Sequence, residues 1–297
     1  MQKNAKTFSK EFVSRFRDFL MDYYGYKSYM DFLILPFLHK KTLMYLPIIS
    51  YTDRTSDNVS DLIEIAKGSD YQIRALNFEY KDFKKDDPVT MRVDLENKTI
   101  DDVLKTFSTN TRKALKKATN KNLAYRCGND DILINDFYKV YKNTLHNHGT
   151  PHFGKSFFYA LREHFGEDVK FSCFYENEDV VGVSCTFYDK DFTLVQWLGV
   201  NPAYKKYGVG YLIYFNEIKN ALKHNKKFSD FGRSGYESGT YEFKRRFRCE
   251  PIKIDIIQPK YENIYSKYSL ASKIWRKLPD SVVEAIGPKL TKYLKDL

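Results

Sequence analysis

The sequence predicts an α+β fold, in which helices and antiparallel strands occupy separate stretches of the chain. Apolar residues at helical spacing dominate residues 99–165, and three apolar runs separated by short polar turns follow within 169–198. A long helix after Pro202 then separates these runs from the last strands. At 297 residues with 42% hydrophobic residues, the chain can bury a sizeable core, as one large domain or two ordinary ones.

The first hundred residues are expected to hold one amphipathic helix, several strands and a polar helix. Phe12, Phe16 and Phe19 are spaced as on one helix face, which predicts a helix within residues 7–30. The other expected elements are a hairpin of strands at 32–38 and 43–50, a polar helix at about 57–67, and strands at 71–78 and 90–95.

The next part of the chain alternates helices with a meander of strands. Asp101 and Asp102 suit the first turn of a helix that begins near Thr99, because their charge complements the helix dipole. Further helices are expected through 112–117, 132–145, 156–165 and from Pro202 to about Lys223, and strands at 169–175, 180–188, 192–198, 228–231, 241–247 and 252–257.

The tail from about residue 261 has a composition of its own. An apolar stripe alternates with basic residues: Ile264, Tyr268, Ala271, Trp275 and Leu278 with Lys267, Lys273, Arg276 and Lys277. A capping box of Ser281 and Glu284 is expected to open the next helix, and Gly287-Pro288 to end it. The stripe suits packing on the main body or contact with an anionic bilayer, and both remain open.

The charge balance predicts an anionic partner. Lys and Arg exceed Asp and Glu by 49 − 38 = 11, and seven of these cations lie between Leu104 and Arg126 without an acidic residue. A phosphorylated cofactor, a nucleic acid and a membrane surface all fit. The four cysteines include no CxxC pair, no secretory signal is visible, and the longest apolar run is far shorter than a bilayer span. We therefore expect a cytoplasmic protein that is at most peripheral to the inner membrane.

A glycine-containing loop after the strand that ends at Val200 predicts a phosphate site. Gly208 and Gly210 open a helix, where free N–H groups bind phosphate, and Lys205 and Lys206 add positive charge. The segment Lys205-Lys206-Tyr207-Gly208-Val209-Gly210 resembles the acyl-coenzyme A loop of GNAT acyltransferases, with Lys205 where that family has Arg or Gln. The resemblance implies binding by Val200, Lys205, Lys206, Gly208, Val209 and Gly210.

A second segment places several reactive side chains within a dozen residues. Arg233 suits an anionic group, Glu237 can act as a base and Tyr241 as an acid. Phe231-Gly-Arg-Ser234 followed by Gly239-Thr-Tyr-Glu-Phe-Lys244 is similar to FemAB-like acyltransferases, including the group of envelope-polysaccharide (exosortase/PEP-CTERM) systems. Segments 108–118, 149–153, 275–279 and 286–288 fit the same family, whereas His146, Phe247 and Arg248 depart from its pattern.

This resemblance implies a GNAT-like acyltransferase fold with two GNAT-like lobes and a helical tail. The expected limits are a degenerate lobe at 1–98, a catalytic domain at 99–260 and an amphipathic tail at 261–297. The implied reaction transfers an acyl group from acyl-CoA, with acetyl-CoA the first choice, to an amine of an amino sugar or lipid-linked glycan of the cell envelope. The expected catalytic residues are Glu237, Tyr241, His146 and His148, and the expected substrate-binding residues are Arg233, Ser234, Lys244, Thr150 and Trp197.

Two other readings remain open. A Fem-type transferase that uses aminoacyl-tRNA fits the basic helix, whereas the glycine loop favours coenzyme A. A non-catalytic peripheral membrane or nucleic-acid binder that keeps the fold is the other alternative. His146 and His148 lie two residues apart without Cys or an acidic cluster, so we expect no metal site.

Overall fold

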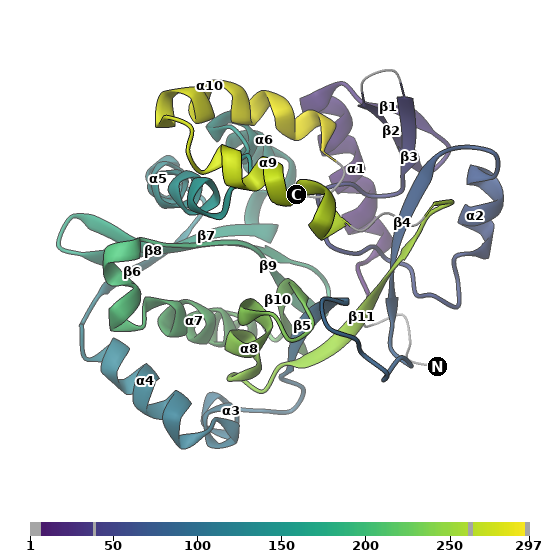
Figure 1. Cartoon of the computed structure of the whole chain (residues 1–297). Helices are drawn as coiled ribbons and strands as arrows, with labels where there is room; N and C mark the ends of the chain where they lie inside the picture. The colour runs from purple at the N-terminus through teal and green to yellow at the C-terminus, as the bar shows by residue number, and fades with distance from the viewer. Residues whose placement is uncertain (1–6, 38–39, 261–263, 295–297) are drawn as a thin grey trace. The chain divides into compact units, whose positions relative to one another are not determined.

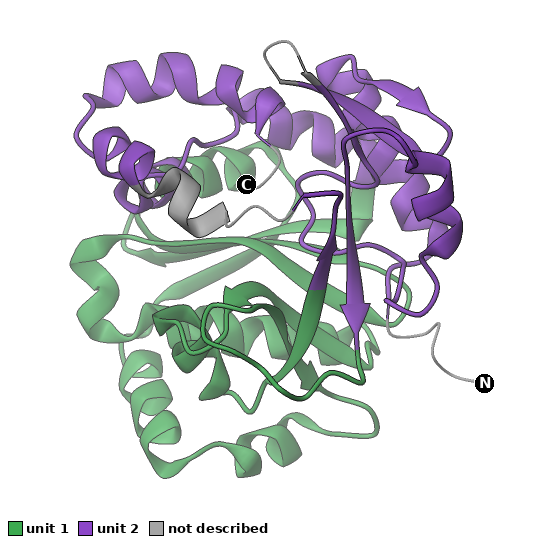
Figure 2. Cartoon of the chain, turned by 45° about the vertical axis from the view of Figure 1, so that its right-hand side comes forward, with its two compact units in different colours: residues 1–6, 78–141, 166–254 green, residues 7–77, 142–165, 255–297 purple. Residues whose placement is uncertain are grey.

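The described part of the chain groups into two compact units. A computed structural model describes residues 7–37, 40–260 and 264–294. Unit 1 holds residues 78–141 and 166–254, and unit 2 holds the remaining described residues (Figure 2). Each unit therefore draws on separate stretches of the sequence. The expected functional limits at 98/99 and 260/261 stay a prediction.

Unit 1 is built on a mixed sheet in which one neighbouring pair of strands is parallel (Figure 1). The strand order is β11-β5-β10-β9-β8-β7-β6, and all neighbours other than β9 and β10 are antiparallel. The strands are β5 (Pro88–Asp94), β6 (Ala124–Gly128), β7 (Val169–Glu176), β8 (Asp179–Tyr188), β9 (Phe192–Val200), β10 (Phe228–Gly235) and β11 (Glu250–Ile257), whose last residues belong to unit 2.

Helices pack against this sheet. The helix α7 (Val209–Lys223) contacts β8, β9 and β10, and the short helix α8 (Gly239–Arg245) contacts β5 and β10. The other helical elements are α3 (Ile100–Thr106), α4 (Thr109–Thr119), α5 (Asp131–His148), whose last residues belong to unit 2, and the 3-10 helices η2 (Gly166–Asp168) and η3 (Pro202–Tyr207).

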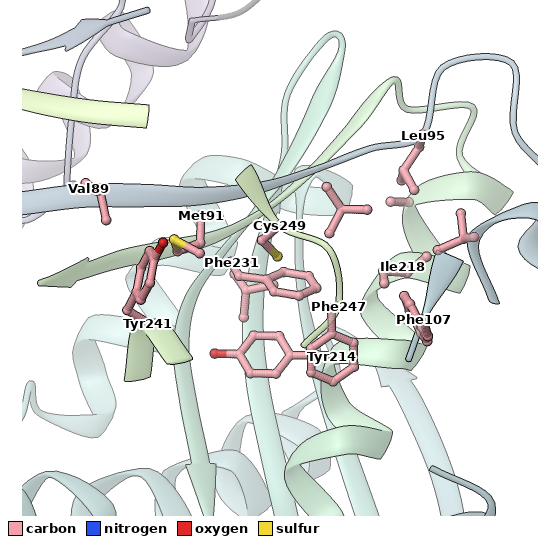
Figure 3. Packing of buried hydrophobic residues seen from close by; sticks show 14 residues of the cluster. Val89, Met91, Leu95, Phe107, Tyr214, Ile218, Phe231, Tyr241, Phe247 and Cys249 are labelled. Atoms are coloured by element: carbon pink, nitrogen blue, oxygen red, sulfur yellow. The ribbon is translucent and has the colours of Figure 1, made fainter. Parts of the chain in front are cut away.

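The core between α7, α8 and the sheet consists of aliphatic and aromatic side chains (Figure 3). The Phe247 ring packs edge-on against Phe231 and Phe107, at centroid distances of 5.7 Å and 5.6 Å, and Tyr214 lies beside Phe231. Buried aromatic rings contribute large apolar areas, so this cluster holds α7 and α8 against β5 and β10.

Unit 2 contains a smaller sheet and an aromatic helix pair. The sheet order is β1 (Lys27–Tyr29), β2 (Phe32–Phe37), β3 (Lys40–Met44) and β4 (Tyr71–Asn77), with β3 and β4 parallel. Helix α1 (Lys10–Tyr24) is capped by the Ser9 hydroxyl and packs against α6 (Lys155–Phe165), with Phe19 5.0 Å from Phe157. The other elements are α2 (Ser60–Ala66), α9 (Ile264–Trp275), α10 (Asp280–Leu290) and the 3-10 helix η4 (Thr291–Tyr293).

The α+β prediction is confirmed, and most expected elements are present near their expected bounds. The helix near Thr99 begins as expected, because the Thr99 hydroxyl and the Asp102 carboxylate form a capping box. Strand β6 was not expected from the sequence.

The strand expected at 241–247 is wrong, because this segment forms helix α8. The Ser238 hydroxyl accepts a hydrogen bond from the Tyr241 N–H and caps the helix. Alternating Tyr241, Phe243 and Arg245 imitate a strand, whereas the helix buries Tyr241 and Lys244, and Phe247 is buried just after it.

Three other expectations also need correction. The helix after Pro202 begins as the 3-10 helix η3, and α7 starts only at Val209. Helix α10 begins after Pro279 without a side-chain cap, so the Ser281–Glu284 capping box is wrong. Pro288 lies inside α10 and does not end it at Gly287.

Candidate active site

The amino end of α7 lies at the end of strand β9. After β9 ends at Val200, the chain makes the 3-10 helix η3 and turns at Gly208, whose φ of 78° falls in the left-handed region. The first N–H groups of an α-helix have no partner within the helix, and this end carries the positive pole of the helix dipole. The first turn of α7, with Val209 and Gly210, is therefore suited to an anion.

Small residues bring three neighbouring elements close to this helix end. A Cβ at Gly182 of β8 would lie 2.4 Å from Val209 Cγ1, and one at Gly210 would lie 3.3 Å from Phe243 Cζ of α8. A Cβ at Gly208 would lie 3.4 Å from Ala118 Cβ of α4. Because Gly208 and Gly210 have no side chains, α4 and α8 can pack close to this helix end. From the sequence alone, this packing role cannot be told apart from a role in which the glycines let a phosphate approach the backbone.

Basic side chains surround this helix end. Lys205 and Lys206 are exposed and form no ion pair with the described residues. Lys121 lies 3.8 Å from the Tyr207 ring centroid, and its ion pair with Glu176 is long, at 4.0 Å. Helix α4, which contacts Gly208, carries four exposed cations without an ion pair to described residues: Arg112, Lys113, Lys116 and Lys117. These side chains therefore make the electrostatic potential at this end of α7 positive.

Strands β9 and β10 pair over only part of their length. Their parallel register covers Phe228↔Phe192, Ser229↔Thr193 and Asp230↔Leu194, whereas both strands continue beyond it. β9 pairs with β8 on its other side, and β10 pairs with β5. Beyond Leu194 and Asp230 the facing edges no longer pair with each other, and this is where an extended ligand could lie between the two strands.

Gly232 marks the point at which β10 departs from the regular register. The pairing of β10 with β5 shifts between Asp230 and Arg233, and Gly232 has a φ of 74°. A Cβ at Gly232 would lie 2.9 Å from the Val195 oxygen. Both the backbone conformation and the close approach of β9 therefore require glycine here.

A buried carboxylate holds this bulge. Asp230 accepts hydrogen bonds from the Gly232 N–H at 2.8 Å and from the Thr90 hydroxyl at 2.6 Å. Arg92 donates to the other oxygen through Nε and Nη2, at 3.2 and 3.1 Å, and both charged side chains are buried. Because a buried charge is costly unless it is fully bonded, this pair fixes β5, β10 and the bulge in one arrangement.

Lys244 holds the same bulge from α8. Its buried Nζ donates to the Gly232 oxygen at 2.9 Å and to the Arg233 oxygen at 3.0 Å. Burial lowers the pKa of Lys244 to about 8, and the Asp230 charge opposes that shift. Lys244 was expected to bind substrate, and this geometry makes it a residue that positions the backbone of β10.

Three other expected substrate-binding residues lie on the parts of β9 and β10 that do not pair with each other. The Ser234 hydroxyl is buried and has no hydrogen-bond partner within the described structure, so it can bond to a ligand. Trp197 is largely buried and pairs in register with Cys185 of β8. Arg233 is half-buried beside Ser234.

The expected acid and base occupy different environments. Glu237 is exposed in the turn before α8, with a φ of 61°. Tyr241 is buried in the core of unit 1, where burial and the neighbouring Tyr236 raise its pKa. A buried phenol with a raised pKa stays protonated, so it can donate a hydrogen bond but is a poor proton acceptor.

His146, His148 and Thr150 belong to unit 2, whereas the site residues described so far belong to unit 1. His146 Nδ1 lies 2.8 Å from an Asp280 oxygen, His148 ends α5, and the Thr150 N–H donates to the Leu145 oxygen. Across residues 7–37, 40–260 and 264–294, no three His, Cys, Asp or Glu side chains gather in a way that could hold a metal ion.

The comparison with protein families identifies the central part of this site. Residues 105–245 match the family described as "Acetyltransferase (GNAT) domain". The chain contains a GNAT acyltransferase domain. The matched range includes β9, the amino end of α7, β10 and α8, but not Thr90 and Arg92 of β5, and its GNAT domain indicates an acyltransferase.

Two solved structures share the fold of the chain that carries this GNAT domain. FemX is 12% identical with a TM-score of 0.56, over 81% of this chain and 86% of the FemX chain. L-PGS from Bacillus licheniformis is 10% identical with a TM-score of 0.53, over 92% of this chain and 98% of the L-PGS chain. The comparison with curated proteins finds no match. The expected GNAT-like α+β fold is thus confirmed.

Sequence reasoning missed Asp230, Arg92 and the bulge at Gly232. Polar residues inside otherwise apolar strands, as in Phe228-Ser-Asp-Phe231 and Thr90-Met-Arg-Val93, are the signal that could have found the pair.

No helix in the described part of the GNAT-containing chain is long and apolar enough to cross a membrane.

Proposed function

We propose that this protein transfers an acyl group from acyl-CoA to an amine, with acetyl-CoA as the first donor to test. The observation that carries the proposal is the end of pairing between β9 and β10 beside the amino end of α7. An extended donor arm can lie between the two strands beyond the end of their pairing, while its phosphates meet the helix end and Lys205 and Lys206. A GNAT domain generally implies an acyl-CoA donor.

The reaction forms an amide and releases a thiol. The amine nitrogen attacks the thioester carbon, the C–S bond breaks, the amine loses a proton to a base and the thiolate takes one up. Backbone N–H groups of β9 between Trp197 and Val200 are our candidates for stabilising the carbonyl oxygen as it becomes negative. Glu237 is exposed enough to exchange a proton with solvent and is our candidate base, and the Ser234 hydroxyl is a candidate substrate contact.

For the acceptor we propose an amino sugar of a cell-envelope polysaccharide or its lipid-linked precursor, modified in the cytoplasm. This proposal depends on the likeness of Phe231-Gly-Arg-Ser234 and Gly239–Lys244 to FemAB-like enzymes of envelope-polysaccharide systems. Arg233 suits an anionic group of such a substrate, because its guanidinium can bind a phosphate or carboxylate through two hydrogen bonds.

The donor is tested by reversing charge at the two exposed lysines of η3. Lys205→Glu with Lys206→Glu should weaken CoA binding by about tenfold or more in a calorimetric titration, because both charges lie beside the helix end. The matched control is Lys219→Glu with Lys223→Glu, which makes the same charge change at the other end of α7.

Equal CoA affinity in the two double variants, with both folded, would exclude binding at the amino end of α7. Thiol release measured with amino-sugar and amino-acid acceptors tests the acceptor separately. Turnover with amino acids alone would overturn the amino-sugar proposal and leave the donor site intact.

A further inference from the structure

The inner side of helix α9 is fixed by the loop that follows α5. Gly149 has a φ of 75°, and a Cβ there would lie 2.4 Å from the Ser272 oxygen and 2.9 Å from Arg276 Nε. Trp275, on the same side of α9, is buried. Because the close contact involves the backbone of α9, the helix can approach this loop only at a glycine, which determines the side of α9 that faces inward.

A histidine–aspartate contact and an ion pair connect the next helix of the tail to α5. His146 Nδ1 lies 2.8 Å from an Asp280 oxygen, and Lys142 Nζ pairs with Glu284. Both acidic residues lie on α10, which follows α9 directly. The tail from Ser272 onward is therefore docked on unit 2, as the packing alternative from the sequence expects.

The outward side of α9 is apolar and basic at once. Lys273 and Ile274 lie three and four residues after Leu270, which places the three on one side of α9, and Lys277 follows in the turn just after the helix ends at Trp275. Leu270 is 68% exposed and Ile274 56% exposed. Both lysines are exposed and form no ion pair with the described residues. We call these four residues the α9 outer face.

Exposed large hydrophobic residues are concentrated in this part of the chain. Among the residues that the structure describes, seven are exposed, and four of them lie in the tail: Leu270, Ile274, Ile286 and Tyr293. Packing of the tail therefore accounts for Trp275, whereas no element among the described residues covers Leu270 and Ile274.

We propose that the α9 outer face is a docking surface for an anionic lipid bilayer. Leu270 and Ile274 would enter the boundary between headgroups and acyl chains, while Lys273 and Lys277 would remain at the level of the lipid phosphates. An RNA partner would use the lysines but not the two aliphatic side chains. The proposal is independent of the acyl-transfer proposal, so either can fail alone.

The test measures flotation of the full-length protein with vesicles of phosphatidylcholine alone or with 30% phosphatidylglycerol. We expect binding to the anionic vesicles only, and a decrease as salt increases, because each lysine near the surface adds to the attraction. Leu270→Asn with Ile274→Asn, and Lys273→Glu with Lys277→Glu, should each reduce the bound fraction at least severalfold. Thermal melting checks that the variants remain folded.

Matched controls use exposed residues outside the tail. Ile132→Asn removes an aliphatic side chain that is 58% exposed on α5, and Lys219→Glu with Lys223→Glu changes two lysines on α7. These controls should bind as the parent protein does. Equal loss in the controls, binding to phosphatidylcholine alone, or no binding to either vesicle would overturn the proposal. The proposal would also be overturned if the lysine double variant lost vesicle binding while the Leu270→Asn with Ile274→Asn variant kept it. That result would indicate a partner bound by charge alone, such as RNA.

Discussion

At the scale of single residues, Asp230 connects the core of unit 1 to the site. Its carboxylate bonds to Arg92 and Thr90 of β5 and to the Gly232 N–H of its own strand. Lys244 binds the two carbonyls that follow, from Gly232 and Arg233. Two buried charged groups thus bond to the backbone of the bulge at Gly232 and Arg233, which restrains this part of β10.

The altered pKa of Lys244 makes a prediction about pH. The pKa of Lys244 is lowered from 10.5 to about 8, so between these pH values the unfolded chain binds more protons than the folded chain. The stability of the parent protein relative to a Lys244→Met variant should therefore rise with pH in this window, by at most about 1.4 kcal/mol per pH unit, and stay constant below it.

Urea unfolding at pH 7, 9 and 10 measures this difference. Lys219→Met is the control for loss of an exposed lysine. If the free energy of unfolding of the parent minus that of Lys244→Met falls between pH 8 and 10, the folded protein favours the charged form of Lys244. That result would contradict the argument that burial lowers its pKa.

At the scale of elements, close packing places the amino end of α7. Gly182 of β8 lies under Val209, and α4 and α8 approach at Gly208 and Gly210. The anion-binding character of the helix end depends on its N–H groups and on the charges around it. The glycines contribute by allowing three elements to meet there.

Adding a methyl group at Gly182 tests this packing. In Gly182→Ala the new Cβ would lie 2.4 Å from Val209 Cγ1, so the first turn of α7 must move away from β8. We expect a loss of about 1–3 kcal/mol in the free energy of unfolding and weaker CoA binding. Tm and CoA titration are the measurements.

Gly239→Ala is the matched control, because no atom lies within 4 Å of the added Cβ. Its effect should stay within about 0.5 kcal/mol. The double variant Gly182→Ala with Val209→Ala should recover part of the lost affinity. Failure of that rescue in a folded protein would show that the contact with Val209 does not position α7.

At the scale of the whole molecule, the net charge of +11 and the basic helix α4 would attract either of two acyl donors, acyl-CoA or aminoacyl-tRNA. Arg112, Lys113, Lys116 and Lys117 are exposed beside the amino end of α7, where CoA phosphates or a tRNA backbone would both be attracted. The positive charge alone does not show which donor binds, because CoA and tRNA both present phosphate groups to the same lysine and arginine side chains.

We expect transfer from acyl-CoA and none from aminoacyl-tRNA. Filter binding of tRNA should be weak and should vanish between about 50 and 200 mM salt, since a few phosphate contacts lose affinity steeply in that range. Transfer from aminoacyl-tRNA in the same assay, or tRNA retention at the higher salt, would reverse this assignment of the donor.

The sequence by itself determined the elements with strong periodicity and the strand-to-helix connection after Val200. Aromatic residues at helical spacing predicted α1, alternating apolar runs predicted β7 to β9, and the glycines predicted a strand–loop–helix at Val200 to Gly210. These signals are local, since the spacing of side chains on a helix or strand depends only on neighbours in the chain. Residues 241–247 show where local spacing fails, because their pattern fits a strand as well as a helix. The Ser238 hydroxyl caps the segment, which forms a helix.

Only the tertiary structure decided the bulge of β10 and its partners. Asp230 lies 140 residues from Thr90 and 138 from Arg92 in the sequence, so their hydrogen bonds depend on the register of β5 with β10. The burial of Lys244 and the contact of Gly182 with Val209 depend in the same way on how helices pack on the sheet. A one-residue change in strand register would turn Asp230 or Arg92 to the opposite face of the sheet, and the packing of α7 and α8 depends on contacts far apart in the sequence, so spacing along the chain could not predict either.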